Sequence, residues 1–224
     1  MSTPIAISRV HFPVTTLGPG RRLGIWLQGC SIRCPGCISM DTWNPGHGVT
    51  TVARVLDAVA AYAAEAEGIT LSGGEPFDQT DALIDLLGGL RRLSRADVLV
   101  FTGYAREAIQ PALDRAAGLI DALISDPFDR TKPQSLALRG SDNQRLHFFT
   151  PRGRERFADF ERPANAADRT FDVMLDDDGT AWLAGIPARD DFRKLRVLLE
   201  ADGHRLGTSE DVRSHAIPSA APPR

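Results

Sequence analysis

Residues 23–37 form the stretch LGIWLQGCSIRCPGC, in which a short apolar run leads directly into three cysteines. The run Leu23–Leu27 predicts a buried β-strand. Cys30, Cys34 and Cys37 follow that strand in a C-x3-C-x2-C array, and the sequence contains no other cysteine. Cysteine thiolates are the ligands of iron–sulfur clusters. Three of them can hold three irons of a 4Fe–4S cluster and leave the fourth iron open, so the array predicts a cluster that binds a substrate or cofactor.

Other uses of three cysteines fit this spacing less well. A C-x2-C pair can form half of a zinc site or a thiol redox pair. A structural zinc site closes with four ligands, and His47, ten residues after Cys37, could complete a Cys3His set. A disulfide scaffold is disfavoured because the cysteine count is odd and the chain is long enough to bury a core.

Composition is typical of a globular protein with one main core. The 224 residues are 42% hydrophobic, and 26 basic against 29 acidic residues give a formal net charge of −3. This balance gives no indication of a nucleic-acid partner. No signal peptide and no membrane-spanning run is recognisable, so we expect a cytoplasmic protein, no membrane association and reduced thiols.

Three further apolar runs repeat the pattern of the first strand. The runs at 69–71, 98–101 and 122–124 each end in polar or glycine-containing residues, and helices with apolar faces are predicted after Thr51 and Thr80. Strands and helices that alternate with short connections favour βα units and a parallel sheet. The loops that follow the strands would then gather at one edge, where such folds assemble their sites.

The C-terminal part of the chain has a different pattern. Alternating apolar residues at 171–175 and 180–184 flank a turn at 177–179, which predicts a β-hairpin, and a helix follows from Phe192 to about Gly203. We therefore expect three parts. They are a core at residues 1–150, an appendage at 151–207 (charged helix, hairpin and helix) and a disordered tail at 208–224.

Four stretches together resemble the radical S-adenosylmethionine superfamily, and within it the activating enzymes of anaerobic (class III) ribonucleotide reductases. The stretches are Gln28–Cys37, Asp41–Asn44, Leu71–Pro76 and Arg139–Gln144. Gly36 before the third cysteine fits this branch, because much of the superfamily has an aromatic residue there. The chain departs from the branch in having Glu75 where aspartate is usual, and in extending well past the length of the compact activators.

The resemblance implies an α/β fold in the form of a partial (β/α)6-type barrel of parallel strands, with the small hairpin-plus-helix appendage added. It implies a 4Fe–4S cluster on the three cysteines and a bound S-adenosylmethionine, whose cleavage gives a 5′-deoxyadenosyl radical. The loop Gly73, Gly74, Glu75 and Pro76 would contact the methionine part. Three residues at strand ends could contact the cofactor or only cap the strands: Thr102, Ser125 and Asp126.

The leading hypothesis is an oxidoreductase that installs a glycyl radical on a partner such as anaerobic ribonucleoside-triphosphate reductase. A flavodoxin or ferredoxin would supply electrons, and no side chain beyond the cluster and cofactor is predicted to be catalytic. The first alternative is a radical enzyme acting on a small molecule or peptide, since such enzymes share both motifs. The second is a non-catalytic iron–sulfur protein, against which the intact Gly73-Gly74-Glu75 loop argues.

Overall fold

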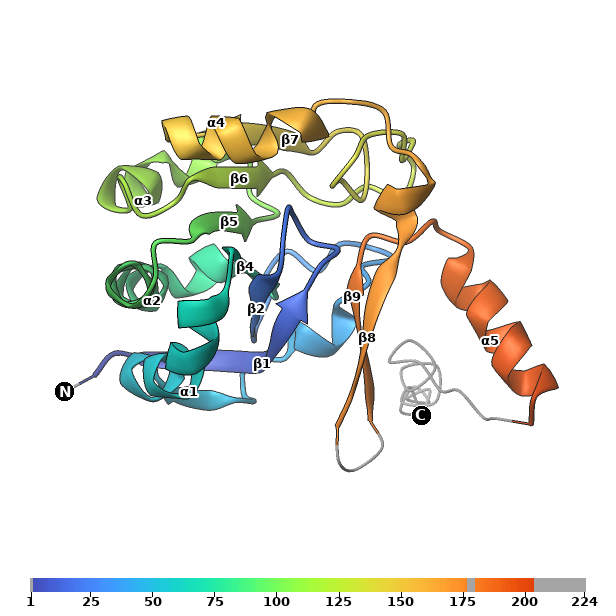
Figure 1. Ribbon diagram of the computed structural model, residues 1–224, viewed down its shortest axis with the longest axis horizontal. Coiled ribbons are helices and arrows are strands. Elements are labelled where there is room, and N and C mark those ends of the chain that lie inside the picture. The colour runs from blue at the N-terminus through green and yellow to red at the C-terminus, as the bar shows by residue number, and fades with distance from the viewer. Residues whose placement is uncertain (1, 177–179, 204–224) are drawn as a thin grey trace, which may run out of the picture. The chain divides into compact units, whose positions relative to one another are not determined.

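The computed structural model describes residues 2–176 and 180–203. The chain divides into two compact units, residues 1–186 and residues 187–224. The first contains a seven-stranded mixed sheet with helices, and the second contains α5 (Asp191–Ala201) (Figure 1). The predicted turn at 177–179 and the predicted tail at 208–224 lie outside the described residues. No described helix is long and apolar enough to cross a membrane.

Four parallel strands form the centre of the sheet. In spatial order they are β2 (Arg22–Leu27), β4 (Gly68–Gly73), β5 (Asp97–Phe101) and β6 (Ala122–Ser125). Nearly every residue in them is buried. Strands buried on both faces appear in a sequence as continuous apolar runs, which is why these four could be predicted.

Antiparallel strands complete the sheet on both sides. β1 (Pro4–Val14) pairs with β2, β3 (Val49–Thr51) pairs with β1, and β7 (Arg145–Phe148) pairs with β6. The sheet of the described residues is open, with β3 and β7 at its edges, so the expected partial (β/α)6-type barrel is not confirmed. A parallel crossover needs a dozen or more residues, usually with a helix. Residues 15–21 are too few for one, and residues 126–144 contain no helix.

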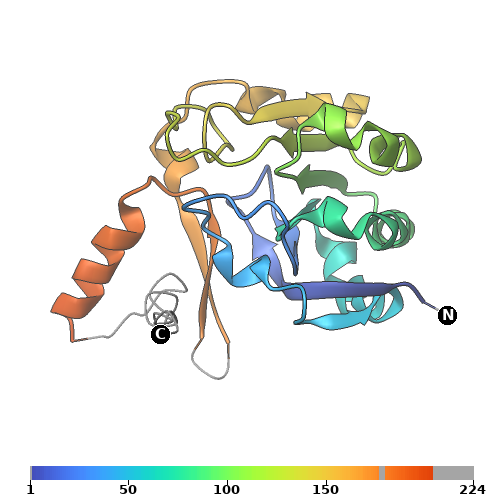
Figure 2. The same ribbon diagram turned by 180° about the vertical axis from the view of Figure 1, so that it is seen from behind.

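Helices cover one face of the sheet. α1 (Val52–Glu65), α2 (Thr80–Leu93) and α3 (Gln110–Arg115) lie along the same side in Figures 1 and 2. They share one buried core with alternate strand residues such as Leu71 and Val100. Short 3-10 helices connect the larger elements: η1 (Met40–Trp43), η2 (Pro76–Gln79), η3 (Arg106–Ile109), η4 (Ala158–Phe160) and η5 (Ala166–Arg169).

The opposite face is covered by α4 (Pro151–Phe157) and by a hairpin of β8 (Phe171–Leu175) and β9 (Ala181–Gly185). The strands of the hairpin pair antiparallel, as the sequence predicts. In β9, Ala184 packs in a cluster with Trp26 of β2. In β8, Asp172 accepts hydrogen bonds from the backbone and hydroxyl of Thr15, at 2.7 and 2.8 Å. The hairpin therefore packs on the sheet as part of the first unit.

A cation lies between the hairpin and the sheet. The guanidinium of Arg9 is 4.6 Å from the ring of Trp182 in β9 and 5.2 Å from the ring of Trp26 in β2. It also forms an ion pair with Asp41 in η1. Cation–π contacts of this kind are worth about 0.5–2 kcal/mol, more when desolvated. One side chain thus connects the hairpin, the sheet and the segment that follows the cysteines.

A buried ion pair joins the beginnings of the parallel strands. The side chains of Arg22 in β2 and Asp97 in β5 are 0% and 1% exposed, with a nitrogen–oxygen distance of 2.6 Å. Arg22 also donates to the hydroxyl of Thr70 at 2.6 Å and to the carbonyl of Ile69 at 2.9 Å, both in β4. Burial lowers the pKa of Arg22, and the Asp97 carboxylate opposes that change. One guanidinium therefore binds two neighbouring strands.

Replacing Arg22 should destabilise the fold strongly. Arg22→Met leaves Asp97 buried with Arg156 as its remaining ion-pair partner, at 3.0 Å. Breaking a buried pair by removing one partner costs about 3–5 kcal/mol, and we expect the lower end of that range from urea unfolding. The matched control is Arg115→Met, because the Arg115–Asp81 pair is exposed and its loss should cost at most about 1 kcal/mol. Equal losses in the two variants would contradict this account.

Candidate functional site

The three cysteines lie in a loop between β2 and η1. All three are half-buried, and none forms a disulfide. Backbone hydrogen bonds close the loop onto η1: Gly29 N donates to Thr42 O at 2.7 Å, and Cys30 N donates to Trp43 O at 3.3 Å. Gly29 has a φ of 97° and Gly36 a φ of 77°, which a residue without Cβ adopts readily. The sequence therefore folds this stretch into a compact turn at the end of a central strand.

Backbone N–H groups donate to the sulfurs of Cys30 and Cys37. Arg33 N lies 3.5 Å from Cys30 Sγ, and Ser39 N lies 3.4 Å from Cys37 Sγ. Burial raises the pKa of all three thiols, and nearby N–H groups oppose that rise by favouring the thiolates.

This donor set fits an iron–sulfur cluster. Three reduced cysteines share one loop, and hydrogen bonds to the sulfurs are what such clusters use to tune their potential. Among the described residues, no three His, Cys, Asp or Glu side chains already stand together as a ready metal site.

The glycine loop after β4 packs directly on the cysteine loop. Gly74 N donates to Leu27 O and Glu75 N donates to Gly29 O, both at 2.8 Å. A Cβ atom on Gly74 would lie 1.9 Å from the carbonyl oxygen of Gly29, and one on Gly73 would lie 2.5 Å from that of Leu27. The sequence predicted that these glycines allow close backbone approach. In the structure the backbone they approach is that of the chain itself.

The side chain of Glu75 is buried beneath both loops. The residue is 1% exposed. One carboxylate oxygen accepts from Phe77 N at 3.0 Å and from the Thr102 hydroxyl at 2.7 Å, and the other accepts from Gly103 N at 2.8 Å. Burial raises the pKa of Glu75 to about 7, although these three donors favour the charged form. Glu75 therefore joins the end of β4 to the end of β5, and Pro76 begins η2 directly after it.

The predicted strand-end residues separate into two groups. Thr102 lies with Glu75, as described. Ser125 and Asp126 lie in another cluster, in which the Ser125 hydroxyl is 2.9 Å from His147 Nε2 and 2.7 Å from the Asp126 carboxylate. Arg145 pairs with Asp126 at 2.7 Å and with Glu107 at 2.8 Å. The Asp126 carboxylate thus already has a cationic partner from β7.

Sequence reasoning missed the contributions of β7 to this edge. Neither His147 nor Arg145 belongs to a motif that the sequence makes recognisable. Burial lowers the pKa of His147, assisted by Arg106 and Arg145. The only signal was the alternation within Arg145–Phe148, which is too short to identify a strand without its partner β6.

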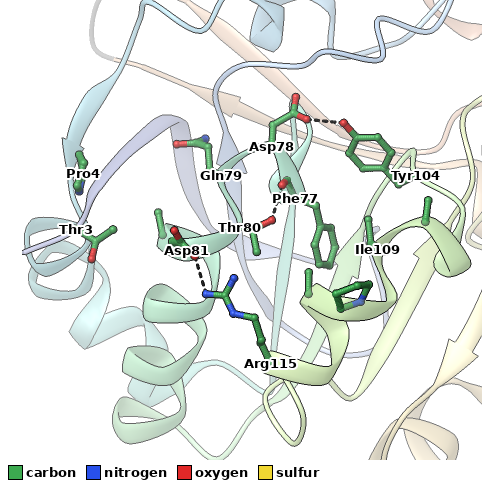
Figure 3. Close-up of a pocket in the computed structure, with 14 residues that line it drawn as sticks. Thr3, Pro4, Phe77, Asp78, Gln79, Thr80, Asp81, Tyr104, Ile109 and Arg115 are labelled. Atoms are coloured by element: carbon green, nitrogen blue, oxygen red, sulfur yellow. Dashed lines mark hydrogen bonds and ion pairs between the residues drawn. The ribbon is translucent and has the colours of Figure 1, made fainter.

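A groove of about 930 Å³ lies beside the cysteine loop, between the starts of α2 and α3. None of the cysteines lines it. Figure 3 shows Asp78 and Tyr104 hydrogen-bonded at its rim, at 2.8 Å. Both also contact Ser31 of the cysteine loop, since Ser31 N donates to Asp78 at 2.7 Å and the Ser31 and Tyr104 hydroxyls are 3.0 Å apart. The groove and the cysteine loop therefore share these side chains.

Substituting Gly74 should destabilise the protein through the cysteine loop. Gly74→Ala places a methyl group against Gly29 O, and overpacking of this kind costs about 1–3 kcal/mol. Gly88→Ala is the control, because its Cβ would meet only the Arg92 side chain at 3.7 Å inside α2. Alanine is favoured over glycine in a helix by about 1 kcal/mol. The urea midpoint of unfolding should therefore fall in Gly74→Ala and rise in Gly88→Ala. An unchanged midpoint in Gly74→Ala would contradict the packing described.

The stability of the cluster-free protein should depend on Glu75 and pH. Between the ordinary carboxyl pKa of 4.5 and about 7, the folded chain holds a proton that the unfolded chain has lost. The free energy of unfolding therefore falls as pH rises through this window, by at most about 1.4 kcal/mol per pH unit for one group. Glu75→Gln should abolish this pH dependence of the free energy of unfolding, measured by urea unfolding between pH 4.5 and 8. Parallel pH profiles of wild type and variant would rule out Glu75 as its source.

Comparison with known proteins shows the family. Residues 16–147 match the family described as a 4Fe-4S single cluster domain. The chain is 31% identical over 147 residues to the anaerobic ribonucleoside-triphosphate reductase-activating protein of Escherichia coli, covering 61% of this chain and 95% of that protein. The corresponding protein of Enterobacteria phage T4 is 29% identical over 134 residues, covering 58% and 85%.

A second kind of relative matches a shorter region. The pyruvate formate-lyase-activating enzyme of Listeria monocytogenes is 41% identical over 88 residues, which is 35% of each chain. Both kinds of relative are radical S-adenosylmethionine enzymes that activate glycyl radical enzymes, and their cofactors are a 4Fe–4S cluster and S-adenosylmethionine. The chain belongs to this family of 4Fe–4S activating enzymes.

Proposed function

We propose that this chain installs a glycyl radical on a partner enzyme, and that the partner is an anaerobic ribonucleoside-triphosphate reductase. The observation that carries the proposal is the direct packing of the glycine loop on the cysteine loop at the ends of β2 and β4. The relatives named for that reductase match this chain over 85–95% of their own length. The relative named for pyruvate formate-lyase matches over 35% of its length, which favours the reductase as partner.

Each loop has a defined part in the proposal. Cys30, Cys34 and Cys37 hold the cluster, which supplies the electron that cleaves the sulfonium bond of S-adenosylmethionine. Gly73 and Gly74 hold the two loops in contact and present the backbone next to the cofactor. Glu75 lies beneath them and accepts hydrogen bonds from Phe77, Thr102 and Gly103, so we assign it to positioning these loops for the methionine group.

The two strand-end groups would serve the cofactor differently. Thr102 acts through Glu75, to which its hydroxyl donates. The Ser125 and Asp126 cluster, with its Arg145 partner, would contact the more distant part of the cofactor. We further propose a flavodoxin or ferredoxin as electron donor and a cytoplasmic location, since a low-potential cluster requires a reducing environment.

The cysteine assignment can be tested directly. After anaerobic reconstitution the wild type should bind about four irons per chain and, with dithionite, cleave S-adenosylmethionine to 5′-deoxyadenosine. Cys34→Ala should lose the cluster and its absorbance, and with them the cleavage. Ile38→Ala is the control in the same loop, because Ile38 is 51% exposed and carries no thiol. Iron content unchanged in Cys34→Ala would overturn the ligand assignment.

The partner assignment needs a separate measurement. Electron paramagnetic resonance of an anaerobic ribonucleotide reductase mixed with the active wild type should show a glycyl radical that is absent with Cys34→Ala. Cleavage without any glycyl radical on that reductase or on another glycyl radical enzyme would replace the proposal with a small-molecule or peptide substrate. Iron binding without cleavage would replace it with a non-catalytic iron–sulfur protein.

A further inference from the structure

A buried glutamine holds the two ends of the cysteine loop together. Gln28 stands directly between β2 and the loop, and it is 4% exposed. Its side-chain nitrogen donates to Asn44 O at 2.7 Å and to Asp41 O at 3.4 Å. Both acceptors follow the three cysteines in the chain, whereas Gln28 precedes them. One side chain therefore connects the start of the loop to its end.

The backbone completes this connection. The N–H groups of Gly29 and Cys30 donate to the two carbonyls between those that Gln28 binds, at 2.7 and 3.3 Å. All four carbonyl groups of residues 41–44 are thus hydrogen-bonded, the inner two to backbone and the outer two to the Gln28 amide. The Gln28 side chain therefore brackets the two backbone bonds that close the loop.

A second glutamine fixes the base of the loop to the rest of the sheet. The side-chain oxygen of Gln79, at the end of η2, accepts from Ala6 N at 2.7 Å. Its side-chain nitrogen donates to Ala6 O at 3.1 Å and to Gln28 O at 3.0 Å. A side-chain amide carries the same donor and acceptor as a peptide group, so Gln79 binds β1 as a neighbouring strand would. The segment after the glycine loop is thereby joined to β1 and to Gln28.

We propose that Gln28 and Gln79 are positioning residues that set the two ends of the cysteine loop before the cluster binds and retain the cluster afterwards. The proposal rests on the proposed function in taking the three cysteines as cluster ligands. Ordering a flexible segment costs conformational entropy, and a segment that is already ordered binds its ligand without that cost. Local opening of the loop would also expose a bound cluster, and the two amides oppose such opening.

The first test measures how fast an iron chelator removes the cluster from the anaerobically reconstituted full chain. Gln28→Met and Gln79→Met keep the length of the side chain and remove its amide. Loss of iron should be about three- to tenfold faster in Gln28→Met, the factor expected for a hydrogen bond of ordinary net strength. The change in Gln79→Met should be smaller and in the same direction. Gln110→Met is the matched control and should match the wild type, because Gln110 is exposed and donates only to Asp114 within α3.

A further control separates positioning from general stability. Thr70→Val removes a buried hydroxyl that accepts from Arg22 and donates to Leu17 O, without touching the cysteine loop. Its urea midpoint of unfolding should fall, but iron loss in the absence of urea should stay at the wild-type rate. An acceleration in Thr70→Val equal to that in Gln28→Met would overturn the proposal, since overall stability would then set cluster retention. A wild-type rate of iron loss in Gln28→Met would also overturn it.

Hydrogen–deuterium exchange of the cluster-free chain gives the second measurement, which needs no bound iron. Exchange should accelerate at residues 29–44 in Gln28→Met and Gln79→Met and stay at the wild-type rate there in Gln110→Met and Thr70→Val. If a variant takes up no iron, this local exchange decides for or against the two amides as the support of the loop, and unchanged exchange would overturn the proposal. A wild type that binds no cluster, with the expected exchange pattern, would instead overturn the proposed function.

Discussion

The contact between two backbone segments at the ends of β2 and β4 is the constraint on which the rest of the site depends. Gly74 N and Glu75 N bond to the carbonyls of Leu27 and Gly29, and no space for a Cβ remains at Gly74. The path of the cysteine loop is therefore fixed by its neighbour before any metal binds. Because Glu75 continues from this contact into bonds with Thr102 and Gly103, the same constraint reaches the next strand.

Charged groups with almost no exposure secure both ends of the parallel strands. At the beginnings of β2 and β5, Arg22 and Asp97 neutralise each other. At the opposite ends, Glu75 has no cation within its hydrogen bonds and relies on neutral donors, and burial raises its pKa to about 7. The Arg22–Asp97 pair is neutral overall and has a structural role. The Glu75 carboxylate has a charge that depends on what binds next to it, which suits the end of the sheet that carries the site.

The parts of the fold that could be predicted are those that a local sequence pattern determines. The four parallel strands are continuous apolar runs, and the cap of α1 at Thr51 was visible in the sequence. β1 and β7 were missed because most of their residues are half-buried, so β1 contains no continuous apolar run, and the alternation in β7 covers only four residues. The cysteine spacing indicated the site chemistry. Thr102 and Gly103, the partners of Glu75, lie on another strand end, so no spacing in the sequence could reveal them.

The hairpin of β8 and β9 lies beyond residue 147, where the match to the family ends. Yet Ala184 and Met174 pack with Val14 and Trp26 of the sheet and with Leu17 of the β1–β2 connection, and Trp182 covers Arg9. Cutting the chain at the family boundary would uncover these apolar side chains on a sheet face, and exposed apolar patches promote association. The limit of sequence similarity and the limit of a stable folding unit are therefore different positions in this protein, and an expressed fragment should be designed from the second.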